Sequence, residues 1–284
     1  MKKRILSMLL VVTLGAALLA GCGSKSDSSS SGSTDTASDT SSDGDLLSSI
    51  KSSGKLVVGT ASGYPPYEFV DVTSSSQDVI GIDIELAQAI ADELGVKLEV
   101  QDMNFSSLLS SLPAHKIDLA IAGINPTDER KKTLDFSDTY LTAENKIIIN
   151  KSDADKYKTL DDFKGQTLAV EKSTTQETVC QEVLPECPLT SLEKVPDCIL
   201  ELKNGKAVGV VVENIVGEQY LLSDDTLQFS DADLNRDKES AVALEKGNED
   251  LLEIINKVIK ENQDNGNFDK WVEEYSQKAA ESAE

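Results

Sequence analysis

Short apolar runs recur along the chain, and each is followed by a polar loop. The runs are rich in Val, Ile and Leu, and their length of four to six residues is typical of buried strands. We predict strands at residues 55–60, 97–100, 117–122, 146–150, 167–170 and 207–212.

Between these runs, apolar residues recur with the spacing of an amphipathic helix. Asp83 is expected to cap a helix whose apolar face ends at Leu94, with Gly95 just past its end. Asn248 is expected to cap a second helix, and residues 268–275 repeat the same spacing. Alternating strands and helices predict an α/β fold, in which ligands bind at the carboxyl ends of the strands.

The first residues have the features of an export signal. Residues 2–4 are basic, and residues 5–19 form an apolar stretch that is shorter than the ~20 residues of a membrane span. The ending Leu-Ala-Gly-Cys resembles the lipobox of bacterial lipoproteins, which predicts a signal peptide over residues 1–21 and diacylation of Cys22. An ordinary signal peptide followed by an incidental cysteine is the alternative.

The segment after Cys22 is almost entirely Ser, Thr, Asp and Gly up to Gly44. Such a composition buries too little apolar area to offset the entropy of ordering, so we predict a disordered tether over residues 22–44. A diacylated Cys22 would anchor the chain to the outer face of the bacterial cell membrane, because each buried methylene contributes ~0.8 kcal/mol. The folded part is expected to begin at Asp45.

The charge of the chain excludes several classes of function. Over 284 residues, 50 acidic against 27 basic side chains give a net charge of −23, which argues against nucleic-acid binding. His115 is the single histidine, and Cys180, Cys187 and Cys198 match no zinc spacing, so no metal or cofactor is expected. An oxidising compartment would favour a disulfide between Cys180 and Cys187, and a reducing one would leave three thiols.

The loops after the predicted strands carry distinctive motifs. In chain order they are GYPPYEF at 63–69, GIDIELA at 81–87, MNFSSL at 103–108, GINPTDER at 123–130, DFSDTY at 135–140 and EKSTTQE at 171–177. Together, over residues 55–275, they resemble the polar-amino-acid-binding family of extracellular solute-binding proteins that serve ABC importers.

This resemblance implies an α/β fold of the periplasmic-binding-protein type (class II), with a ligand cleft between two lobes. The first lobe would be discontinuous, with residues 45–145 and 238–284, and the second would comprise residues 146–237. Periodicity alone would have predicted two consecutive domains.

The resemblance also implies a site for the carboxylate of a free amino acid. Arg130 matches the carboxylate-binding residue, since a guanidinium group fits both carboxylate oxygens. A surface salt bridge within residues 128–132 is the alternative. Thr174 and Thr175 would contribute donors from the facing lobe, and both are also candidates for helix capping. The residues assigned to this part of the site are Gly123, Asn125, Thr127, Arg130, Thr174 and Thr175.

For the ligand ammonium, the family uses an Asp after a Val-rich strand, and this chain has Glu213 there, one methylene longer. We predict that Glu213 binds the ammonium; the alternative is a solvated carboxylate at a helix start. Tyr64 and Phe105 match the two rings that sandwich the ligand side chain, where they would bury an apolar stem and attract a cation. Core packing is the alternative for Phe105.

The ligand side chain is the least constrained part of the prediction. Ala61 stands where many basic-amino-acid binders have Asp, whereas Glu171 and Glu68 lie near the expected pocket. Either carboxylate would receive a cationic side chain, and Gln176 would instead suit an amide. Both glutamates facing solvent is the alternative. We expect arginine or lysine ahead of glutamine, with acidic amino acids last.

The resemblance therefore predicts a monomeric, lipid-anchored binding protein that delivers a polar L-amino acid to an ABC permease and its ATPase. A dehydratase of cyclohexadienyl acids on the same fold is the enzymatic alternative, for which Glu171 and Glu213 are the candidate acids or bases. We expect binding and no catalysis. A sensor that partners a membrane kinase is a third possibility, which the sequence does not distinguish from transport.

Overall fold

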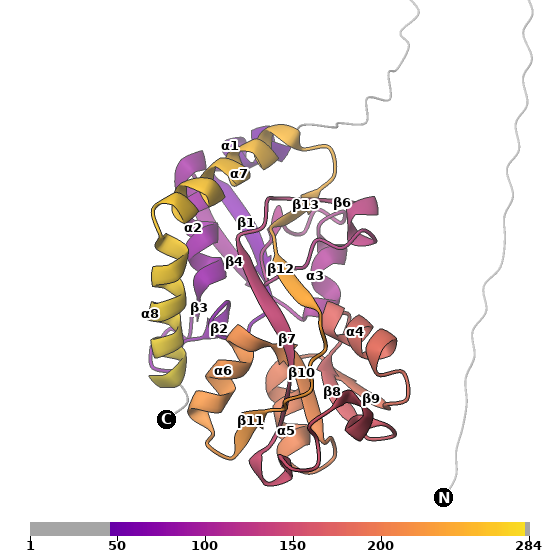
Figure 1. The fold of residues 1–284 in the computed structure, drawn as a ribbon. Coiled ribbons are helices and arrows are strands. Elements are labelled where there is room, and N and C mark those ends of the chain that lie inside the picture. The colour runs from indigo at the N-terminus through magenta and orange to yellow at the C-terminus, as the bar shows by residue number, and fades with distance from the viewer. Residues whose placement is uncertain (1–45, 282–284) are drawn as a thin grey trace, which may run out of the picture. The chain divides into compact units, whose positions relative to one another are not determined.

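The computed structural model describes residues 46–281, which belong to one compact unit of the chain (Figure 1). The predicted signal peptide over residues 1–21, the lipidation of Cys22 and the tether to residue 44 lie outside the described residues. Within the described part, no helix is both long and apolar enough to cross a membrane.

The first sheet has five strands in the order β4-β1-β5-β13-β6. β1 is parallel to β4 and β5, whereas β13 runs antiparallel to β5 and β6. The strands are β1 (Lys55–Thr60), β4 (Lys97–Asp102), β5 (Leu119–Ala120), β6 (Leu134–Phe136) and β13 (Ala243–Glu245).

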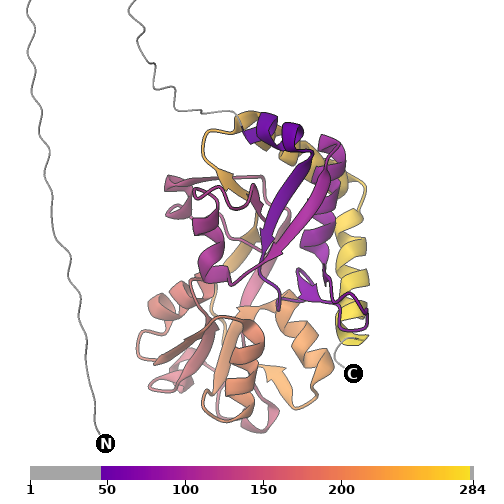
Figure 2. The same cartoon turned by 180° about the vertical axis from the view of Figure 1, so that it is seen from behind.

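Helices cover both faces of this sheet (Figure 2). Leu56 and Val58 of β1 pack with the apolar faces of α1, α2 and α7, while Val57 between them packs with α3 on the opposite face. This alternation is what a strand with two buried faces requires. The helices are α1 (Leu46–Ser53), α2 (Ile82–Leu94), α3 (Phe105–Ser111), α7 (Glu249–Asp264) and α8 (Asn267–Glu281). We call the first sheet with α1, α2, α3 and α7 the first lobe.

The second sheet has the strand order β11-β7-β10-β8-β9. One face packs against α4, and the other packs against α5 and α6. Its strands are β7 (Leu141–Asn150), β8 (Leu168–Glu171), β9 (Leu189–Leu192), β10 (Gly209–Glu213) and β11 (Leu227–Phe229), and its helices are α4 (Thr175–Val183), α5 (Val195–Lys203) and α6 (Asn214–Ser223). We call this sheet with α4, α5 and α6 the second lobe.

Two strands connect the lobes. The first half of β7 pairs with β12 (Asp237–Ser240), and its second half, from Asn145 onward, joins the second sheet. β12 is followed directly by β13 of the first sheet, so both ends of the described chain contribute to the first lobe. The proposed domain limits of 45–145 with 238–284, and of 146–237, stay predictions.

Shorter elements complete the chain. They are the hairpin strands β2 (Phe69–Val70) and β3 (Val79–Ile80), and the 3₁₀ turns η1 (Arg130–Lys132), η2 (Lys151–Asp153) and η3 (Leu160–Phe163).

The predicted α/β architecture with two lobes is confirmed, with local differences. The strand expected at residues 117–122 is only Leu119–Ala120, and the strand expected at 146–150 starts five residues earlier, at Leu141. Gly95 ends α2 in the left-handed conformation, as predicted. Cys180, Cys187 and Cys198 are all buried free thiols.

The prediction that Asp83 caps α2 is wrong. The cap position is Gly81, and the Asp83 carboxylate instead accepts hydrogen bonds from the backbone N–H of Gly123 (2.8 Å) and the hydroxyl of Tyr140 (2.9 Å). A Cβ on Gly81 would lie 2.1 Å from the carbonyl oxygen of Tyr67, so only glycine fits where this loop crosses the helix start. Asp83 thus fixes a site loop rather than a helix end.

Asn248 occupies the cap position of α7, as predicted, but its side chain does not cap the helix. The amide donates to the carbonyl oxygen of Glu245 at 2.9 Å. The side chain therefore closes the turn before the helix.

Candidate functional site

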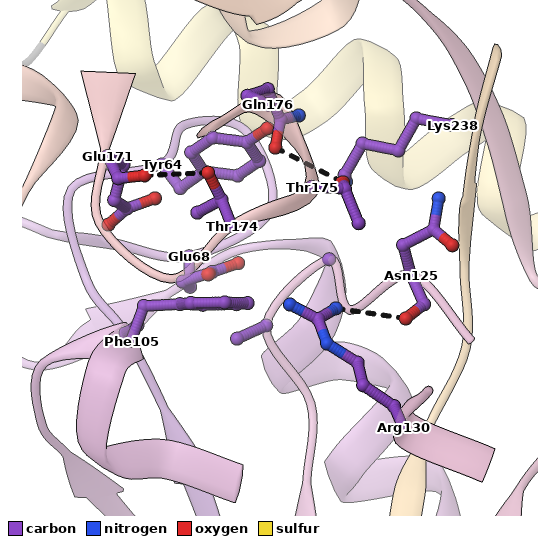
Figure 3. Close-up of a pocket in the computed structure, with 13 residues that line it drawn as sticks. Tyr64, Glu68, Phe105, Asn125, Arg130, Glu171, Thr174, Thr175, Gln176 and Lys238 are labelled. Atoms are coloured by element: carbon purple, nitrogen blue, oxygen red, sulfur yellow. Dashed lines mark hydrogen bonds between the residues drawn. The ribbon is translucent and has the colours of Figure 1, made fainter. Parts of the chain in front are cut away.

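Loops from both lobes surround a cavity (Figure 3). It lies past the carboxyl ends of β1, β5 and β8, where ligands collect in open α/β sheets. The lining residues are Ala61, Tyr64, Glu68, Phe105, Ala122, Gly123, Asn125, Arg130, Glu171, Thr174, Thr175, Gln176 and Lys238.

Most of the predicted site residues are brought together here. Tyr64, Phe105, Gly123, Asn125, Arg130, Glu171, Thr174 and Thr175 all line the cavity. Thr127 and Glu213 do not line it, and Lys238, which no sequence pattern indicated, does. Which of these residues contact a ligand stays a prediction.

Arg130 provides a positive charge at one end of the cavity. Its guanidinium donates to the carbonyl oxygens of Asn125 (2.9 Å) and Ser173 (3.0 Å), which come from different lobes, and its carbon lies 5.5 Å from the centre of the Phe105 ring. No ion pair joins Arg130 to a carboxylate within residues 46–281. Burial lowers the pKa of Arg130 to about 10, so the group stays charged at neutral pH. It is therefore a cation held in place by neutral partners, with further donors to offer.

Thr127 stabilises the turn that presents Arg130. Its hydroxyl accepts a hydrogen bond from the backbone N–H of Arg130 at 3.2 Å. Thr127 thus stabilises the backbone at Arg130 and does not line the cavity.

The start of α4 supplies hydroxyl groups from the second lobe. Thr174 caps the helix by accepting from the Glu177 N–H at 3.3 Å, and its own hydroxyl donates to the Glu171 carbonyl at 2.6 Å. Thr175 donates to the Gln176 side chain at 3.4 Å. Capping and lining the cavity therefore coexist at Thr174.

Aromatic rings and buried carboxyl groups form the rest of the wall. Tyr64 and Phe105 are each 8% exposed. Figure 3 shows the Glu171 carboxylate and the Arg130 guanidinium on opposite sides of the lining group, with Glu68 and the Phe105 ring between them. The cavity thus has an acidic end and a basic end.

Three buried carboxyl groups hold their protons tightly: Glu68 and Glu171, which line the cavity, and Asp83, which lies behind its wall. Burial raises the pKa of Glu171 to about 8 and that of Asp83 to about 7. Burial and the nearby Asp83 and Glu171 raise the pKa of Glu68 well above its ordinary value. Glu68 is 1% exposed, and its Oε2 has no hydrogen-bond partner among residues 46–281. The alternative that Glu68 faces solvent is therefore wrong, and a cation at this end would be stabilised.

Glu213 lies behind the cavity wall. It is the last residue of β10, is fully buried, and its Oε2 lies 2.6 Å from the Nζ of Lys238. A solvated carboxylate, the alternative considered for Glu213, is therefore wrong. Whether it binds a ligand ammonium stays a prediction.

Lys238 was not predicted because it is a lysine on the buried face of its strand. In β12, Asp237 and Glu239 are exposed, while Lys238 and Ser240 are buried. Hydrophobic periodicity treats lysine as a surface residue, so the period-two alternation of DKES has no apolar face to reveal which side is buried.

Hydrogen bonds join the two lobes around the cavity. Ser106 donates to Glu193 (2.7 Å), Lys194 donates to Ser62 (3.0 Å), and the Tyr220 hydroxyl donates to the Gly63 carbonyl (3.0 Å). With the bond between Arg130 and Ser173, these contacts hold the lobes close together.

A two-lobed α/β fold with an interlobe cavity of this polarity defines a binding protein for small polar solutes. Residues 56–278 match the family described as bacterial extracellular solute-binding proteins, family 3. The chain belongs to this family.

Its relatives include binding proteins for several amino acids. The arginine-binding extracellular protein ArtP of Bacillus subtilis is 35% identical over 95% of this chain and 96% of its own. The L-cystine-binding protein TcyJ of Escherichia coli is 30% identical over 92% of this chain and 94% of its own. The protein described here is thus similar to amino-acid-binding proteins of ABC transporters.

The fold is also similar to that of a solute-binding protein whose crystal structure contains L-arginine. The amino acid ABC transporter substrate-binding protein AbpA from Streptococcus pneumoniae, bound to L-arginine, has a TM-score of 0.80 and 37% identity, covering 82% of this chain and 99% of that one.

Proposed function

We propose that this protein captures free L-arginine and delivers it to an ABC permease and its ATPase. The observation that carries the proposal is the polarity of the cavity, with the Arg130 guanidinium at one end and the ionisable carboxyl groups of Glu68 and Glu171 toward the other. Arginine has a carboxylate for the first end, a guanidinium for the second and an apolar stem between them. The relatives ArtP and AbpA support the same ligand.

In this proposal each group of the ligand has a partner. Arg130 binds the α-carboxylate, Glu213 receives the α-ammonium, and Tyr64 with Phe105 encloses the methylene stem. Lysine is the next best ligand, because it also carries a cation to the acidic end. Glutamine is weaker, and glutamate would place a third carboxylate beside Glu68 and Glu171.

The proposed setting is the outer face of the bacterial cell membrane, where a diacylated Cys22 and the tether of residues 22–44 hold a monomer near its permease. Mass spectrometry of the protein from its own membrane tests this part. Two acyl chains on an N-terminal Cys22 are expected, and an unmodified cysteine would contradict the anchor.

A thermal-shift screen of the purified protein with the twenty amino acids and cystine tests the ligand. A ligand at 100 times its Kd stabilises the native state by ~2.7 kcal/mol, a shift of a few degrees for a protein of this size. The largest shift is expected with arginine. A largest shift with glutamate would overturn the assignment of the acidic end. A largest shift with cystine would instead indicate a ligand like that of the L-cystine-binding relative TcyJ.

We further propose that the protein binds without catalysis, although a buried carboxyl group with a pKa of about 8, as at Glu171, would suit an acid catalyst. Incubation with arginine and with a cyclohexadienyl acid distinguishes the two functions. Both compounds are expected to be recovered unchanged, and dehydration of the acid would establish an enzyme.

A further inference from the structure

A buried ammonium group forms part of the cavity wall. Lys238 lies on β12, one of the two strands that join the lobes, and its side chain is 4% exposed. Its Nζ lies 2.6 Å from Glu213 Oε2 and donates to the Ser240 hydroxyl at 3.3 Å. The ring centres of Tyr64 and Tyr67 lie 5.4 and 5.3 Å from it. A carboxylate, a hydroxyl and two aromatic faces thus surround this cation.

These surroundings are what the α-ammonium of an amino acid requires. The Lys238 Nζ would be 3.1 Å from a Cβ built on Gly123, so it packs closely against the backbone of a first-lobe site loop. Lys238 lines the cavity and Glu213 does not. The lysine head group, which pairs with Glu213, thus lies at the cavity wall, whereas Glu213 itself does not reach it.

The lysine ammonium and a ligand ammonium cannot pair with Glu213 together. Glu213 is fully buried, so no bulk water screens two ammonium groups that share its carboxylate. Among the described residues, Glu213 Oε2 pairs with Lys238, the Tyr67 hydroxyl lies close to the carboxylate, and Oε1 has no partner of good hydrogen-bond geometry, so the carboxylate retains acceptor capacity for a ligand ammonium.

We propose that Lys238 competes with the α-ammonium of the ligand for Glu213 and thereby sets the specificity of the site. This proposal rests on the role of Glu213 in the proposed function. Replacing the Lys238 ammonium by the ligand ammonium at Glu213 contributes little net binding free energy. Selection then depends on the other end of the ligand, where Glu68 and Glu171 favour a cationic side chain.

The charge of Lys238 also acts on the other carboxyl groups of the site. It lowers the pKa values of Glu68, Asp83 and Glu171 against the effect of burial. The four-carbon stem of lysine has the rotamer freedom to move its head group away from Glu213 when a ligand ammonium arrives.

Calorimetry with two ligands tests the competition in the purified protein. The ligands are L-arginine and guanidinovaleric acid, the arginine analogue that lacks the α-ammonium. Lys238→Met is expected to raise the ratio of arginine affinity to analogue affinity by about 10- to 100-fold, because only arginine neutralises the buried Glu213. The matched control is Lys246→Met, at a half-exposed lysine in the turn after β13, and it should leave the ratio unchanged.

The outcomes separate this proposal from the proposed function. An unchanged ratio in Lys238→Met, or an equal loss for both ligands, would overturn the competition while arginine binding by the wild type stands. A wild type that binds neither compound would overturn the proposed function, and the competition with it.

A crystal structure of the wild type with arginine covers the case in which Lys238→Met does not fold. The Lys238 ammonium is expected beyond ion-pair distance of Glu213, replaced there by the ligand ammonium. A retained pair between Lys238 and Glu213 would overturn the proposal.

Discussion

Arginine binding is expected to expel a proton from Glu171. Burial raises the pKa of this carboxyl group to about 8, so at about pH 7 roughly nine-tenths of the molecules carry the proton. A guanidinium group placed against Glu171 favours the carboxylate and lowers the pKa in the complex. Each binding event near neutral pH should therefore release up to about 0.9 proton from this group.

The sign of the pH dependence follows from this release. Affinity for arginine should rise with pH by up to about tenfold per unit below pH 8 and level off above it, because Glu171 is then already ionised in the free protein. Glu68, which also lines the cavity, and the neighbouring Asp83, whose pKa is about 7, add to the total. The contribution of Glu171 is therefore the difference between the wild type and a variant that lacks its carboxyl group.

Calorimetry in buffers of different ionisation enthalpy measures the number of protons released. Glu171→Gln should abolish most of the release and flatten the rise of affinity with pH. Glu186→Gln, at an exposed carboxylate of the same lobe, is the matched control and should change neither. Equal proton release from the wild type and Glu171→Gln would refute the placement of the ligand cation at Glu171.

Three further experiments test the role of Arg130 in binding, the closure of the lobes and the steric constraint at Gly81. Arg130→Ala should weaken arginine binding by roughly 30- to several-thousand-fold in calorimetry, since truncating one partner of a buried charge pair costs ~2–5 kcal/mol; a loss below about threefold would mean that the role is wrongly assigned. Saturating arginine should reduce the radius of gyration in small-angle scattering, because the predicted contacts span both lobes, and an unchanged radius would contradict closure. Gly81→Ala should lower the free energy of unfolding by about 3 kcal/mol or more in denaturant titrations, because its Cβ would meet the Tyr67 carbonyl, whereas Gly165→Ala, which meets no atom within 4 Å, should cost only about 1 kcal/mol; equal costs would contradict the steric account.

The part of the site that could be predicted lies in loops directly after buried strands. Arg130 follows the apolar run that contains β5 in the first lobe, and Thr174 follows β8 in the second, so strand ends indicated each loop and the family resemblance placed both loops at one cleft. Their roles depend on which group they meet across the cavity, and no local pattern encodes that.

The residues that escaped prediction are those whose state depends on distant partners. Asp83 has the sequence context of a helix cap, yet Gly123 and Tyr140 hold its carboxylate inside the first lobe. Lys238 is buried because Glu213, on another strand, compensates its charge. Propensity and periodicity act over a few residues, whereas these contacts arise only when the chain has folded.

The central claim, that the Arg130 guanidinium at one end of the cavity and the ionisable carboxyl groups of Glu68 and Glu171 toward the other select arginine, is tested most directly by comparing arginine with citrulline. Citrulline has nearly the same shape and the same zwitterionic head, but its side chain ends in a neutral urea group. A hydrogen bond to a charged group contributes ~1.5–3 kcal/mol, so calorimetry should give arginine a Kd about 10- to 150-fold lower than that of citrulline. Equal Kd values for the two ligands would contradict the account.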